Sequence, residues 1–325
     1  MPHIYEALTP DTILDAIEAS GFLPDGRILA LNSYENRVYQ IGIEESEPLI
    51  AKFYRPQRWP KESILEEHRF TISLADNEIP VVAPMSNELG ETLHQHQGFM
   101  FSLFPRRSGH WPELGDLDNL EWLGRFLGRI HAIGATEPFQ HRPTIDRQSF
   151  GHDSYQYLLS HGFIPKELEL PYRTLVEDVL TQVDGNYERA GNVTHIRLHG
   201  DCHPGNILWR EDGPWFVDMD DCRMGPAVQD LWMLLSGERE EMAIQMSTLV
   251  EGYEQFMEFD RRELNLLEAL RTLRLIHYSA WLARRWDDPA FQQAFPWFNT
   301  QRYWEEQILT LREQAAKLDE PPLPI

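Results

Sequence analysis

The stretch 198-LHGDCHPGNILW-209 is followed closely by 215-WFVDMDD-221, and in each stretch a cluster of polar residues is flanked by apolar ones. This pattern is typical of a strand that ends in a loop, so we expect each polar cluster where a strand ends or a loop turns. Asp201, Asn206 and Asp218 supply oxygen-bearing side chains to these clusters. Their spacing is the starting point for predicting both the fold and the chemistry.

Phosphoryl transfer requires a carboxylate that takes the proton of the attacking hydroxyl, and ligands that hold Mg²⁺ against the triphosphate of ATP. An Asp followed five residues later by Asn, with a second Asp at the end of a nearby strand, is the arrangement found in protein-kinase catalytic loops. We therefore predict Asp201 as the catalytic base. Asn206 and Asp218 are predicted to bind the metal through oxygen atoms, as Mg²⁺ prefers, and Asp218 is counted as catalytic for that reason. ATP and Mg²⁺ are the predicted cofactors.

Lys52 lies in the middle of a predicted strand, LIAKFY, where a buried ammonium group requires a negatively charged partner. Glu66 and Glu67 occur in the helical stretch that follows. In protein kinases a strand lysine contacts the α- and β-phosphates and is held by a glutamate of the next helix. We prefer Glu67 as this glutamate because Phe70 and Leu74 follow it at +3 and +7, as a resemblance to the kinase family pattern implies, and Glu66 remains the alternative.

The segment 32-NSYENRVY-39 is predicted to cover the nucleotide. It lacks the glycine-rich signature of protein kinases, but short polar residues offer backbone and hydroxyl donors to phosphate. Ser33 is the predicted contact. The backbone of residues 103–105, including Leu103 and Phe104, is predicted by its position to face the adenine.

The periodicity of the chain changes after about 100 residues. Strand-like runs and one helix, at 64–75, come first, after a capped helix between Thr9 and Gly21; longer helical runs follow, with a short β region at 194–218. We therefore predict an α+β, bilobal, protein-kinase-like fold with a β-rich nucleotide-binding lobe, 1–104, and a mainly helical catalytic and substrate lobe, 105–325. The expected strands are 28–31, 37–43, 48–54, 91–94 and 98–104, and the expected later helices are 117–133, 166–188, 229–236, 240–256, 262–286 and 301–317.

The composition of the chain excludes several classes of protein. The 325 residues are 42% hydrophobic and 11% aromatic, which is enough for a globular core. A net charge of −23 argues against a nucleic-acid partner, because phosphate backbones bind clustered Lys and Arg.

Because we find neither a signal peptide nor a membrane-spanning run, we expect a cytoplasmic protein with no membrane partner. The two cysteines, Cys202 and Cys222, lack CxxC spacing and indicate neither a disulfide framework nor a zinc site. No heptad pattern requires a partner, so we expect a monomer.

The HGD loop and the FVDMDD segment resemble the catalytic and metal loops of the aminoglycoside phosphotransferase and choline kinase superfamily. They depart from ordinary protein kinases at Gly200, where Arg is usual, and at 218–220, where Asp-Met-Asp replaces Asp-Phe-Gly. His203 stands where protein kinases have Lys, and we expect it near the γ-phosphate. Most of the chain is similar to the stress response kinase A family, through the HGD loop and the motifs LNSYENRVYQ, KFYRP-x-RW, ILEEH, PAVQDLWMLL, WLARRW-x-DPAF and EPPLP. This resemblance implies a cytoplasmic serine/threonine protein kinase of the bacterial stress response, with protein substrates that include itself as a phosphoprotein.

Other functions remain open at this point. The superfamily also contains small-molecule kinases, whose acceptor is an amino alcohol, an amino acid or an aminoglycoside-like hydroxyl. A non-catalytic nucleotide-binding scaffold is a further alternative, against which the intact set of candidate residues argues. His199, Asp201 and His203 have a spacing that also occurs in zinc sites, but that reading leaves Asn206 and Lys52 unexplained.

Several residues near the motifs have two interpretations each. Asp230 is predicted to brace the catalytic loop, with a simple helix cap as the alternative. Arg274, with Arg271 one turn away, is either surface charge or part of the acceptor side, where it would receive an acidic substrate or phosphate. The two cysteines are either inert and buried or a redox switch.

Overall fold

A computed structural model of the protein describes residues 5–325. By its packing the chain divides into two compact units. The first unit contains the chain up to Glu113 together with Phe139–Arg142 and His203–Cys222, and the second contains the remaining segments. The division into lobes at residue 104 remains a prediction.

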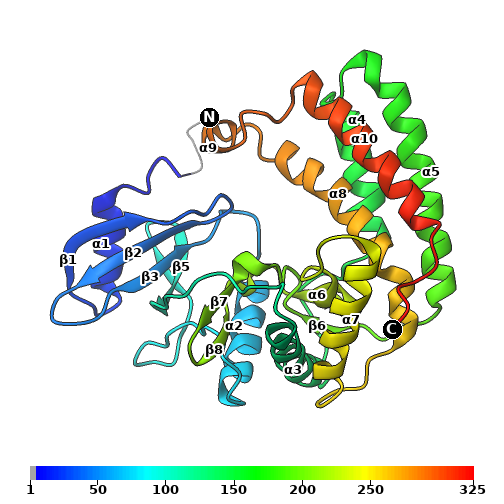
Figure 1. The fold of residues 1–325 in the computed structure, drawn as a ribbon. Helices are drawn as coiled ribbons and strands as arrows, with labels where there is room; N and C mark the ends of the chain where they lie inside the picture. The colour runs from blue at the N-terminus through cyan, green and yellow to red at the C-terminus, as the bar shows by residue number, and fades with distance from the viewer. Residues whose placement is uncertain (1–4) are drawn as a thin grey trace. The chain divides into compact units, whose positions relative to one another are not determined.

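Within the described part of the first unit, an antiparallel sheet has the strand order β1-β2-β3-β5-β4 (Figure 1). Helix α1, Pro10–Ala19, begins at Thr9, whose side chain accepts a hydrogen bond from the Thr12 backbone N–H at 3.2 Å. The apolar side of this helix packs with inward-facing strand residues in one core. The bounds of the strands are Pro24–Ala30 (β1), Arg37–Ile43 (β2), Leu49–Phe53 (β3), His94–His96 (β4) and Phe99–Pro105 (β5).

Two further elements of the first unit lead toward the candidate site. Helix α2, Lys61–Asp76, follows β3 and carries the two neighbouring glutamates. A hairpin of β7, Ile207–Arg210, and β8, Gly213–Phe216, is joined to the segment after α2, because Phe216 exchanges backbone hydrogen bonds with Pro80 and Val82. This joins residues that lie more than a hundred positions apart in the sequence.

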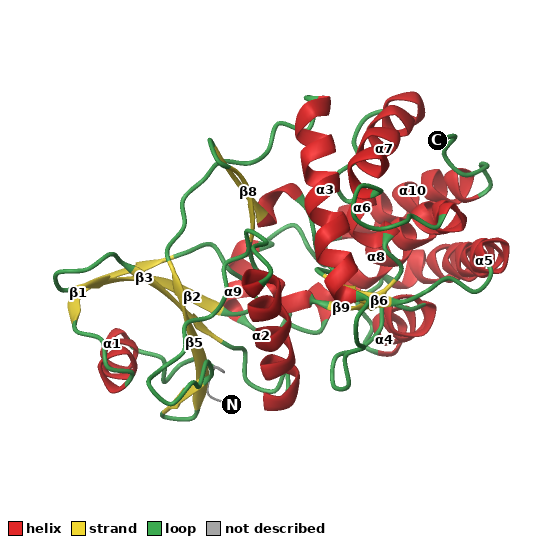
Figure 2. Cartoon of the chain, turned by 90° about the horizontal axis from the view of Figure 1, so that it is seen from below, coloured by secondary structure: helices red, strands yellow, loops and turns green. Residues whose placement is uncertain are grey.

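The described part of the second unit is mainly helical, as Figure 2 shows. A short antiparallel pair, β6 (Ile196–Leu198) and β9 (Arg223–Gly225), lies among the helices. Helix α10 packs along α5, and α8 packs against α4. The helices are α3 (Leu117–Gly134), α4 (Asp153–Ser160), α5 (Lys166–Ala190), α6 (Val228–Trp232), α7 (Arg239–Tyr253), α8 (Leu267–Ala283), α9 (Pro289–Ala294) and α10 (Gln301–Leu318).

Helices α3 and α7 approach each other closely because glycines lie between them. A Cβ atom on Gly124 would overlap the carbonyl oxygen of Leu249, and one on Gly252 would overlap that of Glu121. Larger side chains at these positions would force the helices apart. Since α3 carries His131, this packing also positions part of the candidate site.

The α+β fold class and most of the predicted elements are confirmed, but some bounds were wrong. The strand expected at 91–94 is found at His94–His96, because Asn87 binds the backbone N–H groups of Leu89 and Glu91 and turns the chain there. The helix expected at 229–236 ends at Trp232 and continues as turns. The helix expected at 262–286 begins with a 3-10 turn, and its α-helical part starts at Leu267. Helices α4 and α9 were not predicted.

None of the helices among residues 5–325 combines the length and the apolar character that crossing a membrane requires.

Candidate active site

The β7–β8 hairpin brings two of the predicted site residues to the same end of a small sheet. Ile207 pairs with Phe216, and the Asn206 carbonyl accepts a hydrogen bond from the Val217 N–H at 3.0 Å. Asn206 precedes one arm of the hairpin and Asp218 follows the other. Both predicted metal ligands therefore leave the hairpin at its open end.

Asp218 has an unusual backbone conformation, with φ 58° and ψ 62°. Asp adopts this left-handed region more readily than most residues other than glycine, and such conformations cluster at functional sites. About half of its side chain is exposed, and its Oδ1 lies 2.9 Å from the Nζ of Lys52. The carboxylate is thus accessible to a ligand while contacting the predicted phosphate-binding lysine.

Lys52 is a buried cation surrounded by carboxylates. Its Nζ lies 2.9 Å from Asp218, 3.4 Å from Asp220 and 3.9 Å from Glu67. Burial alone would lower the pKa of Lys52, but these three carboxylates outweigh that effect and raise it well above its ordinary value. The lysine is therefore charged at neutral pH, as its predicted role in contacting phosphates requires.

The two glutamates of α2 have different partners. Glu66 accepts hydrogen bonds from three consecutive backbone N–H groups, those of Gln140, His141 and Arg142, at 2.6, 2.8 and 3.0 Å. Glu67 is the glutamate near Lys52. Burial raises the pKa of Glu67 to about 7, although Lys52 and Arg142 act in the opposite direction.

Arg142 connects these elements and was not predicted from the sequence. Its guanidinium donates to Glu67 Oε2 at 2.9 Å and to the backbone carbonyls of Ser63, Asp220 and Cys222 at 2.9, 2.5 and 3.2 Å. It also lies over the Trp59 ring, 4.6 Å from its centroid. All of its hydrogen-bonding partners are 75 to 80 positions away in the chain, so no local pattern marks it.

Asp220 is buried and ties the loop after β8 to the rest of the first unit. It pairs with the guanidinium of Arg58, and it accepts a hydrogen bond from the Asn36 side chain at 3.1 Å. Arg58 also contacts Asp221 at 2.8 Å. Burial alone would raise the pKa of Asp220, but Arg58 and Lys52 together hold it below its ordinary value. Arg58 belongs to the KFYRP-x-RW motif of the family resemblance, but the sequence analysis assigned it no role.

The remaining predicted nucleotide contacts lie in the first unit. The Ser33 hydroxyl donates to the carbonyl of Asn36 at 3.1 Å, so it stabilises the loop whose Asn36 side chain binds Asp220. Leu103 is buried in β5, and its carbonyl accepts from the Met85 N–H at 2.7 Å. Phe104 follows it and pairs with Ile50 of β3. These positions remain predictions as nucleotide contacts.

The loop that carries Asp201 belongs to the second unit and is held by Asp230. The two carboxylate oxygens of Asp230 accept from the backbone N–H groups of His199 and Gly200, at 2.8 and 2.9 Å. Gly200 has φ +82°, a conformation that glycine adopts without steric cost. Buried His131 lies 3.0 Å from Asp230, and its other ring nitrogen lies 3.1 Å from the Tyr253 hydroxyl. Asp230 therefore braces the loop, as predicted, and His131 supports it.

Asp201 contacts an arginine of helix α8. Arg274 Nη1 lies 2.7 Å from Asp201 Oδ1, and the side chains are 38% and 23% exposed, respectively. Both are thus accessible to solvent although they pair with each other. Arg271, one turn earlier, pairs instead with Glu268 at 2.9 Å.

The zinc and redox alternatives gain no support from these contacts. Among residues 5–325, no group of three or more His, Cys, Asp and Glu side chains is arranged to hold a metal ion. His199 is fully buried, and its ring accepts from the Asp201 N–H at 3.4 Å. Cys202 and Cys222 are buried, and burial raises the pKa of both thiols, that of Cys222 to about 12. Thiols of this kind are poor nucleophiles.

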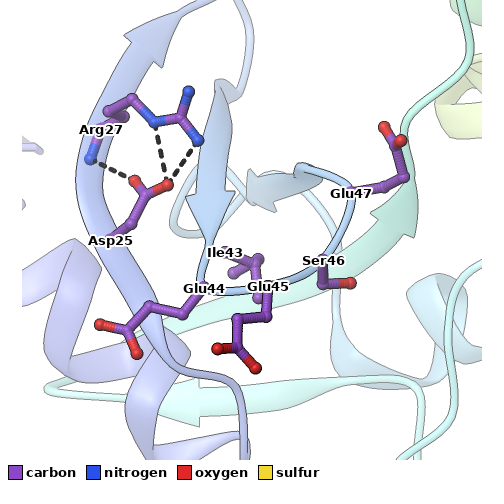
Figure 3. A pocket seen from close by; sticks show the side chains of 7 residues that line it. All are labelled: Asp25, Arg27, Ile43, Glu44, Glu45, Ser46 and Glu47. Carbon is purple, nitrogen blue, oxygen red and sulfur yellow. Dashed lines mark hydrogen bonds and ion pairs between the residues drawn. The ribbon is translucent and has the colours of Figure 1, made fainter.

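A pocket at the turn between β2 and β3 has different chemistry (Figure 3). Its lining includes the carboxylates of Glu44, Glu45 and Glu47, while Asp25 pairs with Arg27 at 2.5 Å. A triphosphate would be repelled by these carboxylates. We therefore do not regard this pocket as the nucleotide site.

Comparison with known proteins identifies the family. Residues 27–267 match the model of the phosphotransferase enzyme family. The chain belongs to this family. It is 46% identical over 319 residues to stress response kinase A of Escherichia coli strain K12, and 44% identical to the serine/threonine protein kinase RdoA of Salmonella typhimurium strain LT2. Each alignment covers 98% of this chain and 96% of the relative. This phosphotransferase is therefore a kinase, as predicted, and its resemblance to stress response kinase A is confirmed.

Solved structures support the kinase-like fold of this phosphotransferase. An amicoumacin kinase in complex with AMP-PNP and Ca²⁺ has a TM-score of 0.73 at 18% identity, and the match covers 96% of this chain and 95% of that one. A microcompartment-associated aminopropanol kinase has a TM-score of 0.71 at 15% identity, with coverage of 94% and 96%. At these identities the similarity concerns the fold alone.

Proposed function

We propose that this phosphotransferase is a serine/threonine protein kinase that transfers the γ-phosphate of ATP with the help of Mg²⁺. The observation that carries the proposal is the position of Lys52, a buried cation 2.9 Å from Asp218 and 3.9 Å from Glu67. This is the set of groups that protein kinases use to hold phosphates and metal. The relatives named stress response kinase A and serine/threonine protein kinase RdoA support the choice of acceptor.

The candidate metal ligands fit a hard divalent cation. Asp218 and Asn206 offer carboxylate and amide oxygens, which Mg²⁺ prefers to nitrogen or sulfur ligands. Both residues leave the same end of the β7–β8 hairpin, and the Asp218 side chain is half exposed. When bound, the metal would neutralise charge on the phosphates. The amicoumacin kinase, solved with a nucleotide analogue and Ca²⁺, supports the use of a divalent metal.

The other side chains have defined roles in this proposal. Asp201 accepts the proton of the acceptor hydroxyl, and Asp230 holds its loop through the N–H groups of His199 and Gly200. Lys52 contacts the α- and β-phosphates. Glu67 provides a second carboxylate near the lysine and is itself held by Arg142.

The proposed acceptor is a Ser or Thr residue of a cytoplasmic protein, including a second copy of this protein or its own chain. We propose that the kinase acts as a monomer. A small-molecule kinase is the second candidate, because the similar folds include that of an aminopropanol kinase.

Incubation of the purified protein with γ-labelled ATP separates these possibilities. We expect Mg²⁺-dependent transfer of label to the kinase itself or to a generic Ser/Thr protein, and none after chelation of the metal. Asp201→Asn is the matched variant, because it keeps the shape of the side chain but cannot act as a base. Labelling of an amino alcohol but of no protein would replace the proposed function by the second candidate. Equal labelling by Asp201→Asn would contradict the assignment of the base.

A further inference from the structure

The candidate base lies beside a part of the chain with an unusual charge. Residues 269–286 contain four arginines and no Asp or Glu, although the whole chain has 52 acidic residues among 325. This stretch includes almost all of helix α8, from which Arg274 reaches Asp201. In a protein of net charge −23, residues 269–286 are a locally positive stretch.

The four arginines have different contacts. Arg271 pairs with Glu268 and lies over the Trp232 ring. Arg284 lies over the Tyr157 ring, 5.0 Å from its centroid, and Arg285 lies over that of Trp281 at 5.1 Å. Arg274 is the arginine of this group that contacts Asp201.

Neighbouring groups of the second unit add positive charge and aromatic surface. His277, three residues after Arg274, stacks on Phe150 with ring centroids 4.1 Å apart, and Arg223 lies over the same Phe150 ring at 5.2 Å. Tyr278, one helical turn after Arg274 and so on the same side of α8, is 40% exposed and stacks on Trp281. A surface that begins at the candidate base thus continues along α8 with a guanidinium and then an aromatic ring.

We propose that Arg274 selects an acceptor segment with a carboxylate next to the phosphorylated hydroxyl, that is, a Ser or Thr flanked by Asp or Glu. The inference rests on the proposed function. A hydroxyl that reaches Asp201 must come close to the partly exposed side chain of Arg274. A carboxylate beside that hydroxyl would be attracted by the guanidinium, whereas the ammonium of a basic peptide or of an amino alcohol would be repelled. Arg–carboxylate pairs are also directional, because the planar guanidinium donates two parallel hydrogen bonds.

The test compares acceptors that differ only in charge. The full-length protein is assayed with MgATP and matched Ser peptides in which the flanking residues are Glu, Gln or Lys, together with glycerate and 1-amino-2-propanol as small acceptors. Arg274→Gln removes the charge but leaves a donor for Asp201, Arg274→Lys keeps the charge, and Arg284→Ala removes a charge elsewhere on the same stretch. We expect the wild type to prefer the Glu peptide to the Lys peptide by about tenfold or more in kcat/KM, mainly through KM.

Arg274→Gln should bring this ratio close to one. Because Arg274 contacts Asp201, the ratio is taken within each variant, so that a change in turnover common to all peptides cancels. Arg274→Lys and Arg284→Ala should keep most of the preference. The inference is overturned if the wild type shows no preference for the Glu peptide, or if Arg274→Gln retains the preference. Transfer to small acceptors but to no peptide would contradict the protein-kinase function. In that case the ratio of kcat/KM for glycerate to kcat/KM for 1-amino-2-propanol would still test the role of Arg274. ATP hydrolysis without transfer to any acceptor would contradict both proposals.

Discussion

Arg142 Nη2 lies 2.9 Å from Glu67 Oε2, and both side chains are buried. The same guanidinium binds the backbone on both sides of Asp221. One residue from a distant segment thus fixes helix α2 and the loop that follows Asp218. This arrangement was not foreseen, and it leads to the first prediction.

Arg142→Met should destabilise the first unit and weaken nucleotide binding. The substitution leaves the buried carboxylate of Glu67 without its guanidinium partner, and breaking a buried ion pair in this way costs about 3–5 kcal/mol. Denaturant unfolding and titration with MgATP would measure the two effects. Arg125→Met is the matched control, because Arg125 forms a comparable pair with Glu121 at the surface. Equal stability of the two variants would contradict the role of Arg142.

Asp230→Asn should lower turnover by roughly ten- to a hundredfold, because a misplaced catalytic loop costs about that much. Each oxygen of Asp230 accepts from one of the two N–H groups, of His199 and of Gly200, whereas Asn replaces one oxygen by an NH2 group, which is itself a donor and cannot accept from an N–H. Nucleotide affinity should remain close to that of the wild type, since the proposed phosphate-binding residues belong to the first unit. Steady-state transfer and nucleotide titration would test this, with Asp184→Asn, at an exposed ion pair, as the control. A purely structural helix cap would leave turnover unchanged.

Asp201→Ala and Asp218→Ala should both abolish measurable transfer, but through different steps. Loss of the proposed base leaves binding of the metal and nucleotide intact, whereas loss of the proposed metal ligand weakens metal-dependent nucleotide binding as well. Nucleotide affinity measured with and without Mg²⁺ distinguishes the two. Normal turnover in both variants would refute the assignment of the site.

The pH dependence of stability should report on buried Glu263. Burial raises the pKa of Glu263 to about 7, although the Val228 N–H donates to its carboxylate at 2.8 Å. Because the folded state holds this proton more tightly than the unfolded chain, the contribution of Glu263 to the free energy of unfolding is full below pH 4.5. This contribution decreases as the pH rises from 4.5 to about 7. The total decrease in the free energy of unfolding is at most about 3 kcal/mol.

Glu263→Gln should remove this part of the pH dependence, so the difference in stability between wild type and variant should fall between pH 4.5 and 7. Asp260→Asn is a control, because the pKa of Asp260 is shifted in the opposite direction to that of Glu263. The Arg262 side chain lowers the pKa of Asp260, and its effect therefore lies below pH 4. Denaturant unfolding at a series of pH values would measure both. A constant difference for Glu263→Gln across that range would be contrary to the prediction.

Both cysteines should react slowly with alkylating agents in the folded protein. Burial raises the pKa of Cys202 and Cys222, so few thiolates form at pH 8, and neither thiol is exposed. Mass spectrometry after iodoacetamide treatment, with and without denaturant, should show modification only after unfolding. Rapid modification of the native protein, or inhibition by peroxide that Cys222→Ser removes, would restore the redox-switch interpretation.

The sequence was most informative about candidate site residues that lie close to one another along the chain. Asp201, Asn206 and Asp218 lie within 18 positions of one another, so their motif was visible, and Lys52 was marked by its apolar strand. Helix and strand types followed from periodicity in the same way.

Partners that are distant in the chain could not be predicted. Arg142, His131 and Asn36 act through contacts 75, 99 and 184 positions away, and no local pattern specifies such pairs. The strand expected at 91–94 failed for a different reason. The side chain of Asn87 accepts from the backbone N–H of Glu91, which the expected strand would have used, and from that of Leu89 just before it.

The β7–β8 hairpin restricts how this protein can change during evolution. Glu211 and Asp212 form its tip, beyond the Arg210–Gly213 pair, whereas Asn206 and Asp218 leave its open end. Extra residues at the tip would leave the pairing of the arms intact. Loss of one residue from either arm would turn its side chains to the opposite face and misalign Asn206 and Asp218, the two proposed oxygen ligands. Length differences among natural homologues should therefore occur at residues 211–212, while the arms keep their length.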